Sequence, residues 1–453
     1  MTITATKVKS GDEILASHHN SLVDDVQLID KKVTNSRETS IPRVDIEGDV
    51  DSIKGKDDKK DVLFKIFQNG KEIKEYATIK WQGDSSLVFD KKSFRIRFFT
   101  DETRVEREKI QILPFVPKVS DINLKAYATD WTKGNDVIVA KVGSELTMLN
   151  GEQLEPEQRF GPNQEYITGY PITVYVNGNY QGLYSLNTKK GDAVISDDNN
   201  PLNACIQAST NGSQTAFKAS TATFDPEVDF ELISPDKLTT EIEQSFDDIM
   251  RLSFSRTEGE FKNKISEKVN LQSFANWIVL IMYFTLNDTI TKNIIYQTRD
   301  GMKWSAVPYD FDLAWGINWN GTAWSNYDTM TFDVLKDKNR LIKRLIELNV
   351  ITDHLQKAQN IFRKKFDAPK IIGMYQDLML EIGSTEYMKE QEKWPATNTM
   401  DTYDAVDLFK FIQKRFDFCD KEFSKLFGEN SEPDAPTVIT VDPDVDAAKV
   451  SAK

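Results

Sequence analysis

Apolar and polar residues alternate along most of the segment from residue 42 to about residue 190. A period of two places successive side chains on opposite faces of a strand, so these runs predict strands with one buried face. Asn69-Gly70 and Asn177-Gly178 are typical of hairpin turns. The predicted strands cover residues 44–47, 62–67, 76–81, 94–99, 172–176 and 182–186, and a helical pattern covers residues 137–149. This part of the chain predicts an antiparallel sheet that carries at least one helix.

After Leu238 the apolar residues recur every three or four positions, which is typical of helices. One predicted hairpin, with Arg299-Asp300-Gly301 at its turn, interrupts them, and residues 308–312 (PYDFD) follow it at once. The predicted helices cover residues 242–250, 271–286, 341–366, 371–382 and 405–427. The pattern as a whole predicts an α+β protein with a sheet-rich first half and a mainly helical second half.

The two ends of the chain differ from the segment between them. Residues 1–40 contain no aromatic residue, and apolar residues at spacings of three and four between Leu22 and Val33 predict a short amphipathic helix. A helix this short must pack on the rest of the chain, on a second copy in a coiled coil, or on a larger assembly. Residues 428–453 are acidic, contain proline and lack aromatic residues, which predicts a disordered tail.

The composition excludes several classes of protein. Among 453 residues, 57 are Lys or Arg and 71 are Asp or Glu, and the net charge of −14 repels phosphate backbones, so we expect no nucleic-acid partner. The two cysteines, Cys205 and Cys419, offer neither a disulfide framework nor a zinc site. We expect no signal peptide and no membrane insertion, because the most apolar run, residues 271–286, is too short to span a bilayer. With three histidines in the chain, any catalysis would depend on carboxylates, lysine, arginine or the backbone.

Four polar residues stand where the predicted hairpin would bring them to one end: Asp288, Asn293, Asp310 and Asp312. Carboxylates that converge repel one another unless a hard divalent cation lies between them, and magnesium on a nucleotide takes oxygen ligands of this kind. These residues therefore predict a magnesium site. The structural alternative is that Asp288 caps a helix end and the two later aspartates form a turn.

A second group of residues is suited to bind an anion. Residues 81–87 (WQGDSSL) predict a turn with glycine and serine donors, and within residues 91–97 (KKSFRIR) alternation puts Arg95 and Arg97 on the same face of a strand. The alternative is a solvated basic strand face beside a glycine turn.

Together these segments resemble the CotH kinase family, which is named for a spore coat protein and is similar to a diverged protein-kinase-like fold. The resemblance covers residues 40 to 427 and implies two lobes, an antiparallel-sheet N-terminal lobe at residues 41–235 and a helical C-terminal lobe at residues 236–427. It rests on four blocks in the family's order: residues 79–86 (IKWQGDSS) with 91–97; residues 124–127 (LKAY) with Asp130; residues 174–184 (VYVNGNYQGLY); and residues 287–293 (NDTITKN) with 308–316 (PYDFDLAWG).

The resemblance also implies an ATP-dependent protein kinase in which Asp288 accepts the proton of a protein hydroxyl. Asn293 and either Asp310 or Asp312 would hold Mg²⁺ or Mn²⁺. The ATP phosphates would be covered by Gly83, Ser85, Ser86, Lys91 or Lys92, and Arg95.

Two positions depart from the family's usual pattern. Gln82 stands where an arginine usually precedes the glycine, and residues 187–189 (NTK) stand where a glutamate usually follows the third block. Because loss of an arginine removes a bidentate phosphate donor, a catalytically inactive kinase-like scaffold is the alternative to an active kinase.

The leader resembles the N-terminal attachment segments of phage tail and head fibre proteins, since residues 9–26 (KSGDEILASHHNSLVDDV) contain a Gly-Asp turn and then an Asn-containing helix start. This implies a virion protein assembled in the host cytoplasm, with residues 1–40 binding other virion proteins or further copies of the chain in a homo-oligomer. A third alternative is a module that binds the host surface, in which Trp315, Trp319 and Trp324 stack on sugars, although tryptophan clusters more often belong to the core.

Overall fold

The computed structural model of the chain describes residues 41–428, apart from 69, 115, 117, 152–165, 168, 191–199, 220–223, 255–256, 322–325 and 396–403. The predicted leader helix, residues 429–453 of the predicted tail, and Trp324 lie outside the described residues. Two compact units are interleaved along the chain. Unit 1 comprises Met1–Gly134, Gly169–Thr188 and Met374–Asn398, and unit 2 comprises Asn135–Thr168, Lys189–Gly373 and Thr399–Lys453.

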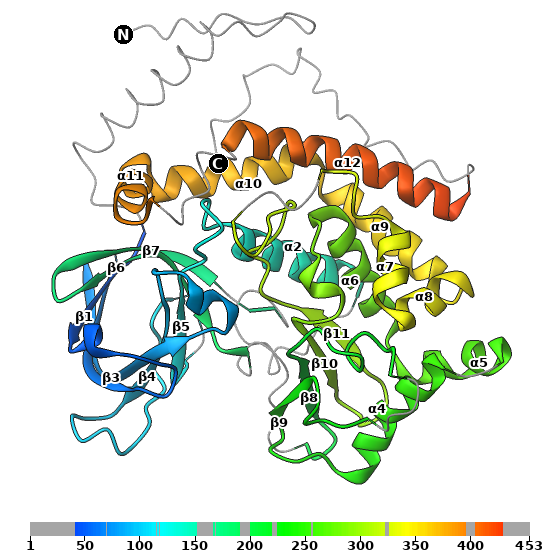
Figure 1. Cartoon of the computed structure of the whole chain (residues 1–453), viewed down its shortest axis with the longest axis horizontal. Coiled ribbons are helices and arrows are strands. Elements are labelled where there is room, and N and C mark those ends of the chain that lie inside the picture. The colour runs from blue at the N-terminus through cyan, green and yellow to red at the C-terminus, as the bar shows by residue number, and fades with distance from the viewer. Residues whose placement is uncertain are drawn as a thin grey trace, which may run out of the picture. The chain divides into compact units, whose positions relative to one another are not determined.

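Seven strands of unit 1 close into a barrel in the order β1-β2-β3-β4-β5-β7-β6, with β6 returning to β1 (Figure 1). Alternate side chains point into an apolar core that includes Ile46, Phe64 and Ile96. Each pair of neighbouring strands is antiparallel except β1 and β6, which pair in parallel with Val44 opposite Val174. The strands are β1 (Arg43–Gly48), β2 (Lys60–Gln68), β3 (Lys71–Gln82), β4 (Ser93–Phe99), β5 (Asp121–Lys125), β6 (Gly169–Val176) and β7 (Asn179–Thr188).

The closed, mixed barrel corrects the predicted antiparallel-sheet lobe, and with it the predicted two-lobed kinase-like arrangement. The local hairpins β2–β3 and β6–β7 lie where the turn residues predicted them. The prediction was wrong at the closure, because β1 and β6 are far apart in the sequence and no local pattern encodes their parallel pairing. Closure removes both exposed sheet edges, which an open antiparallel sheet would have left unpaired.

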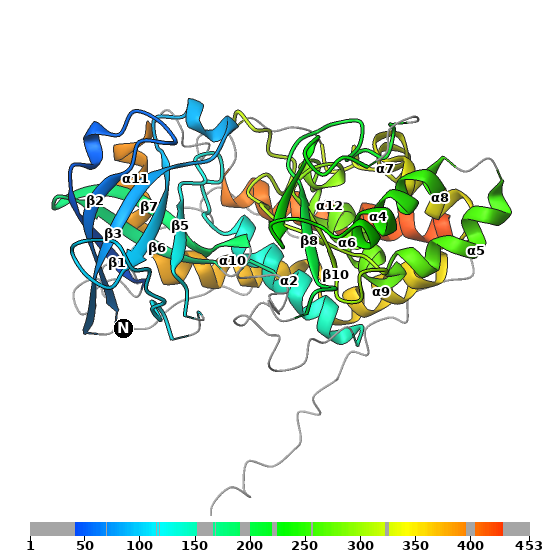
Figure 2. The same ribbon diagram turned by 90° about the horizontal axis from the view of Figure 1, so that it is seen from below.

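Unit 2 contains a second, antiparallel sheet in the order β11-β10-β8-β9, seen with its surrounding helices in Figure 2. Its strands are β8 (Ala204–Ala208), β9 (Phe230–Ser234), β10 (Ile294–Thr298) and β11 (Ser305–Pro308). The predicted hairpin is therefore the β10–β11 half of a larger sheet, whose strands β8 and β9 precede residue 236. This corrects the predicted division into a sheet lobe at residues 41–235 and a helical lobe at residues 236–427.

Ten α-helices lie within the described residues. They are α2 (Asn135–Leu149), α4 (Thr240–Ser253), α5 (Glu258–Lys268), α6 (Leu271–Phe284), α7 (Phe332–Lys338), α8 (Arg340–Glu347), α9 (Thr352–Lys365), α10 (Ala368–Ile382), α11 (Ser384–Lys393) and α12 (Ala405–Phe427). None of the helices in the described part of the chain has the length and apolar character needed to cross a membrane.

Helix α6 forms the centre of unit 2. It packs against α2, α9, α12 and strand β11, and every residue from Phe274 to Phe284 is buried. A helix that is hydrophobic on all sides is stable only when it is surrounded in this way. Asn270 caps its first turn, and Thr285 ends it in a left-handed conformation, so the chain leaves the helix toward Asp288.

Arg415 of α12 satisfies backbone carbonyls beside the C-terminal end of α6. Its side chain is fully buried, and its guanidinium donates to the carbonyl oxygens of Met282 (2.6 Å), Tyr327 (2.7 Å) and Met330 (2.8 Å). Burial lowers the pKa of this guanidinium. Arg415 therefore links α12 to α6 and to the loop before α7 through several hydrogen bonds at once.

We predict that Arg415→Met lowers the free energy of unfolding by about 3 kcal/mol, because it leaves several buried carbonyls without donors. The control is Lys421→Met on the exposed side of the same helix, for which we expect a change within about 0.5 kcal/mol. Urea denaturation of both variants measures the difference. Equal stability of the two variants would show that the carbonyls find other partners.

Candidate active site

Asn293 and Asp310 lie side by side at one end of the β10–β11 hairpin. Ile294 pairs with Pro308, and the backbone N–H of Tyr309 donates to the Asn293 carbonyl oxygen at 2.9 Å. Both residues have a left-handed backbone, with φ of 56° for Asn293 and 63° for Asp310. Asn and Asp adopt this conformation more readily than other residues with a Cβ, and such strained positions concentrate at functional sites. The hairpin thus places the backbones of Asn293 and Asp310 at the same end, and their joint role as metal ligands stays a prediction.

Asp288 lies on the loop between α6 and β10, five residues before Asn293. The short 3₁₀ helix Asp288–Ile290 is fixed from two sides: Trp277 Nε1 donates to the Thr289 carbonyl at 2.7 Å, and Asn339 Nδ2 donates to the Ile290 carbonyl at 3.0 Å. The carboxylate of Asp288 forms an ion pair of 2.7 Å with Lys292, and both side chains remain about one quarter exposed. Asp288 is therefore held on a rigid turn while its carboxylate stays accessible.

The first turn of α2 holds the loop that contains Asp312. Asp136 is buried and accepts a hydrogen bond of 2.9 Å from the Phe311 N–H, and Asn135 Nδ2 donates to the Asp312 carbonyl oxygen at 3.0 Å. No sequence pattern indicated this contact, because α2 precedes the loop by about 175 residues. Asp310 and Asp312 thus differ in setting: Asp310 adjoins Asn293, and the backbone at Asp312 is tied to α2.

These residues suit a magnesium ion that arrives with a nucleotide. Within the described residues, no three His, Cys, Asp or Glu side chains are arranged to hold a metal ion. Magnesium, however, needs only one or two protein oxygens when phosphates and water complete its coordination. One amide and one carboxylate at the end of the hairpin match that requirement.

The predicted phosphate turn lies between β3 and β4 in unit 1. Gly83 has a φ of 112°, and the 3₁₀ helix Ser85–Val88 follows it, so Ser85 and Ser86 lie at the start of this turn. Lys92 is occupied by the same turn, since its Nζ donates to the carbonyl oxygens of Leu87 (2.7 Å) and Phe89 (2.5 Å).

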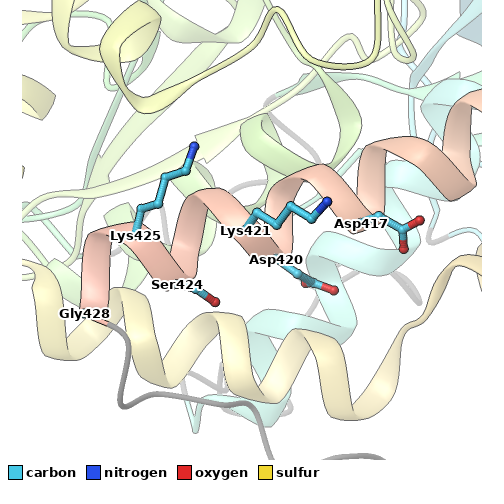
Figure 3. Close-up of a pocket in the computed structure, with 6 residues that line it drawn as sticks. All are labelled: Asp417, Asp420, Lys421, Ser424, Lys425 and Gly428. Carbon is cyan, nitrogen blue, oxygen red and sulfur yellow. The ribbon is translucent and has the colours of Figure 1, made fainter.

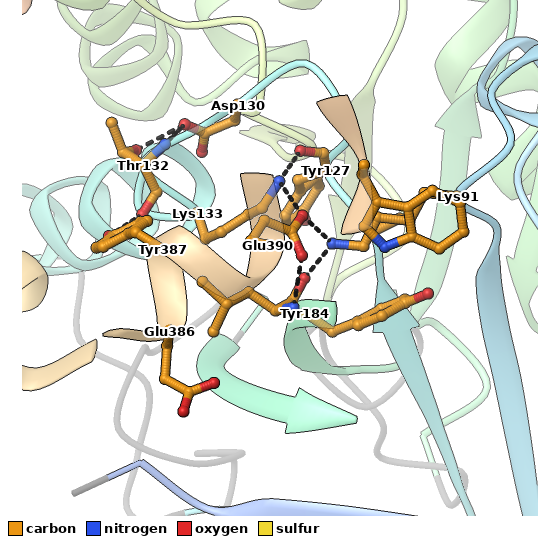
Figure 4. Close-up of polar contacts among 12 residues, drawn as sticks. Lys91, Tyr127, Asp130, Thr132, Lys133, Tyr184, Glu386, Tyr387 and Glu390 are labelled. Atoms are coloured by element: carbon orange, nitrogen blue, oxygen red, sulfur yellow. Dashed lines mark hydrogen bonds and ion pairs between the residues drawn. The ribbon is translucent and has the colours of Figure 1, made fainter. Parts of the chain in front are cut away.

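Lys91 lies in a buried cluster, shown in Figure 4. Its side chain has an exposed fraction of 0%, and its Nζ is 2.5 Å from Glu390 Oε1 on α11. The other oxygen of Glu390 accepts the Leu183 N–H of β7 at 2.8 Å, and a second lysine, Lys133, lies 3.4 Å from Oε1. The cluster therefore joins α11 to the barrel. The sequence did not identify Glu390, which stands 299 positions after Lys91.

Lys91 and Lys133 share the Glu390 carboxylate in this cluster, and their burial and charges shift the pKa values of Lys91 and Glu390. Burial lowers the pKa of Lys91 to about 7, against the opposing effect of the Glu390 charge. Burial would raise the pKa of Glu390, but the charges of Lys91 and Lys133 outweigh it, and the pKa falls below its ordinary value. Glu390 therefore stays ionised at neutral pH, and Lys91 is the group that releases a proton.

Arg95 belongs to a third environment, on the outside of the barrel, where its Nε lies 3.5 Å from Asp121. The residues predicted to cover the ATP phosphates thus have separate partners in unit 1: Glu390 for Lys91, the turn carbonyls for Lys92, and Asp121 for Arg95. The three basic side chains are therefore not gathered around one ligand.

The predicted tryptophan group is also divided. Trp315 is buried and packs on Phe284 with ring centroids 4.9 Å apart, whereas Trp319 is 54% exposed. Trp315 therefore belongs to the core of unit 2 and has no face available for a sugar.

An open hollow of about 870 Å³ follows one side of α12 (Figure 3). It is lined by Asp417, Asp420, Lys421, Ser424, Lys425 and Gly428. These residues recur at helical spacing, and Asp420 is already bonded to Tyr283 (2.6 Å) and Arg363 (3.0 Å). The hollow is an exposed helix face of mixed charge, and we assign no chemistry to it.

Comparison with protein families finds a match that covers most of the described chain. The family described as CotH kinase protein matches residues 79–419, which is more than half of the chain and includes Asp288, Asn293, Asp310 and Asp312. The chain belongs to the CotH kinase protein family. No curated protein matches the chain. The match extends across both units, from β3 to α12.

We predict that the free energy of unfolding rises between pH 7 and pH 9, by up to about 1.4 kcal/mol per pH unit, and that Lys91→Met removes this rise. Lys91 has a lowered pKa of about 7 in the folded protein and about 10.4 in the unfolded chain. In this range the unfolded state therefore binds more protons, so raising the pH favours folding.

Urea denaturation at several pH values measures the slope. Lys92→Met is the matched control, because it removes the adjacent lysine, whose Nζ donates to the carbonyl oxygens of Leu87 and Phe89 and not to Glu390. An unchanged slope in Lys91→Met would show that another group causes the pH dependence.

Proposed function

We propose that this CotH family member transfers the γ-phosphoryl group of ATP to a protein hydroxyl. The observation that supports this most strongly is the hydrogen bond from the Tyr309 N–H to the Asn293 carbonyl, which pairs Asn293 with the residue just before Asp310 at the hairpin end. The spacing from Asp288 to Asn293 equals that between the catalytic Asp and the metal-binding Asn in the protein kinase catalytic loop. Asp288, Asn293 and Asp310 follow one another in the same chain order as the catalytic Asp, the metal-binding Asn and the metal-binding Asp of protein kinases.

Each residue has a role that its setting permits. Asp288, on its fixed turn, accepts the proton of the attacking hydroxyl. Asn293 and Asp310 hold magnesium, which neutralises charge on the phosphates when it is bound. We assign Asp310 as the main metal ligand because it adjoins Asn293, and Asp312 as part of the loop that α2 positions.

Lys292 supports the role of Asp288. The Lys292 ammonium lies 2.7 Å from the Asp288 carboxylate and fixes its position on the turn. The same cation can also contact the transferring phosphoryl group, as lysine does in other phosphate sites. Lys91 and Lys92 act through the structure of unit 1, where Lys91 pairs with Glu390 and Lys92 donates to the carbonyl oxygens of its own turn.

We predict that Asp310→Asn removes magnesium-dependent ATP binding and that Asp288→Asn retains binding but loses transfer. At a hundred times the dissociation constant, ATP with magnesium adds about 2.7 kcal/mol to the stability of the bound protein. A thermal unfolding scan measures binding, and transfer is followed with ATP labelled at the γ-phosphate and casein as acceptor. Loss of the general base lowers the transfer rate by roughly 10² to 10⁴-fold.

Asp333→Asn on α7 is the matched control, because this aspartate is exposed and pairs only with Lys336 among the described residues. It is expected to bind and transfer like the wild-type protein. Absence of any ATP-dependent shift at millimolar nucleotide would contradict the kinase proposal and favour the inactive scaffold.

A second proposal concerns the place of the protein. We propose that it is a virion component anchored by residues 1–40, because the leader resembles fibre attachment segments and its predicted apolar stripe needs a surface to pack on. Such a role is compatible with phosphoryl transfer, since the attachment segment and the candidate active site lie in different parts of the chain.

We predict that deletion of residues 1–40 leaves the unfolding temperature within about 2 °C of the full chain, since a predicted short helix with its own docking partner contributes little to two folded units. The deletion is expected to abolish association with other virion proteins or with further copies, measured by analytical ultracentrifugation and co-sedimentation with particles. Collapse of the truncated protein would instead show that the leader packs on its own body.

A further inference from the structure

Three arginines surround one buried carboxylate on the outer face of the barrel in unit 1. Asp121 of β5 has an exposed side-chain fraction of 1%, and its Oδ1 lies 2.9 Å from Arg97 Nε and 3.5 Å from Arg95 Nε. Its Oδ2 accepts from Arg107 and, at 3.1 Å, from the Ser120 hydroxyl. Three positive charges against one negative charge leave an excess of two in a protein whose net charge is −14.

Strand pairing fixes this arrangement. Arg95 and Arg97 alternate with inward-facing residues on β4, so both guanidinium groups lie outside the barrel. Arg97 stands opposite Asp121 on β5, and an isolated bridge between Phe99 and Arg107 returns the chain alongside the end of β4. Lys80 of β3 stands opposite Arg95 and adds a further positive charge to the same row. The cluster is therefore built by the sheet and does not depend on a loop conformation.

The guanidinium groups retain donors beyond those that Asp121 uses. The buried Nε of Arg95 faces Asp121 at 3.5 Å without forming a hydrogen bond, so Asp121 holds Arg95 less tightly than Arg97. The three side chains keep exposed fractions of 31% for Arg95, 37% for Arg97 and 40% for Arg107. Glu106 and Glu108 flank Arg107 in the sequence, but the ion pairs of the three arginines within the described residues all go to Asp121.

We propose that the cluster of Arg95, Arg97 and Arg107 binds the phosphate group of a phosphorylated serine or threonine on a partner protein. Planar guanidinium groups with paired N–H donors match the oxygens of a phosphate dianion, whose two charges equal the excess on the cluster. Asp121 acts as a positioning residue that holds the arginines together in the absence of the ligand. Although burial favours its protonated form, the three arginines hold the pKa of Asp121 below its ordinary value, so it remains charged.

The location of the cluster separates it from the predicted nucleotide turn. Ser93 pairs with Gln82, which stands beside Gly83 of the turn. Arg97 lies four residues further along β4, and four strand residues span about 13 Å. The cluster therefore lies about that distance from the turn. The surface is a half-exposed sheet face, which suits a side chain presented by another protein. This proposal does not depend on phosphoryl transfer by unit 2.

The test compares binding of a fluorescent peptide containing phosphoserine with the same peptide unphosphorylated, at fixed ionic strength. The phosphopeptide is expected to bind at least about tenfold more tightly, and Arg97→Gln is expected to remove that difference. Arg43→Gln is the matched control, because Arg43 lies on β1 of the same barrel and pairs with a single aspartate, Asp45. It is expected to leave the difference intact.

Asp121→Asn separates binding from folding. Removing the competing carboxylate is expected to strengthen phosphopeptide binding, and inorganic phosphate is expected to raise the unfolding temperature of this variant more than that of the wild type, with chloride as the reference. A purely structural cluster would give a destabilised variant with no phosphate response. The proposal is overturned if both peptides bind equally, if Arg97→Gln changes nothing, or if ATP competes through these arginines while the phosphopeptide does not bind.

Discussion

Complete burial of helix α6 is the constraint on which the architecture of unit 2 depends. No side of this helix reaches solvent, so each surrounding element must supply an apolar face, and the polar groups at its ends must be satisfied from within the protein. Ser273 bonds to Ala306 of β11 in both directions at 2.9 Å, and the Phe284 carbonyl accepts the Trp315 N–H. These bonds tie the helix to the sheet and to the loop after it. The positions of the candidate catalytic residues depend on these bonds, because Asp288 lies just after the end of α6 and Asp310 lies just after the end of β11.

Buried ionic groups are stabilised in three different ways in this protein. Lys91 is paired with a carboxylate from a distant helix, Asp121 is surrounded by more arginines than it can neutralise, and Arg415 is bonded to carbonyl oxygens alone. A buried charge is costly unless hydrogen bonds or counterions replace water. The contacts of Lys91 and Arg415 are made within the protein and hold separate elements together. The arrangement around Asp121 leaves charge and donors at the surface, which is why it is the one to which we assign a ligand.

The barrel of unit 1 and the hairpin of unit 2 show why membership of a family does not by itself fix an activity. The CotH family match spans both units, yet the features that bear on chemistry are a few residues at the end of one hairpin. Function depends on such sites and not on the surrounding architecture. The departures at Gln82 and residues 187–188 lie in unit 1, whereas Asp288, Asn293 and Asp310, to which we propose the acid and metal roles, lie in unit 2.

The sequence by itself determined the local elements. The alternation at residues 62–67 and 76–81 specified β2 and β3, the apolar run at residues 271–286 specified α6, and the turn at residue 301 set the register of β10 against β11, because a hairpin register follows from its turn. Tertiary structure alone decided the parallel closure of β1 on β6, the pairing of Lys91 with Glu390, and the support of Phe311 by Asp136. Each of these contacts joins residues more than a hundred positions apart. Such contacts depend on how complete elements pack, and no periodicity within a short window records that.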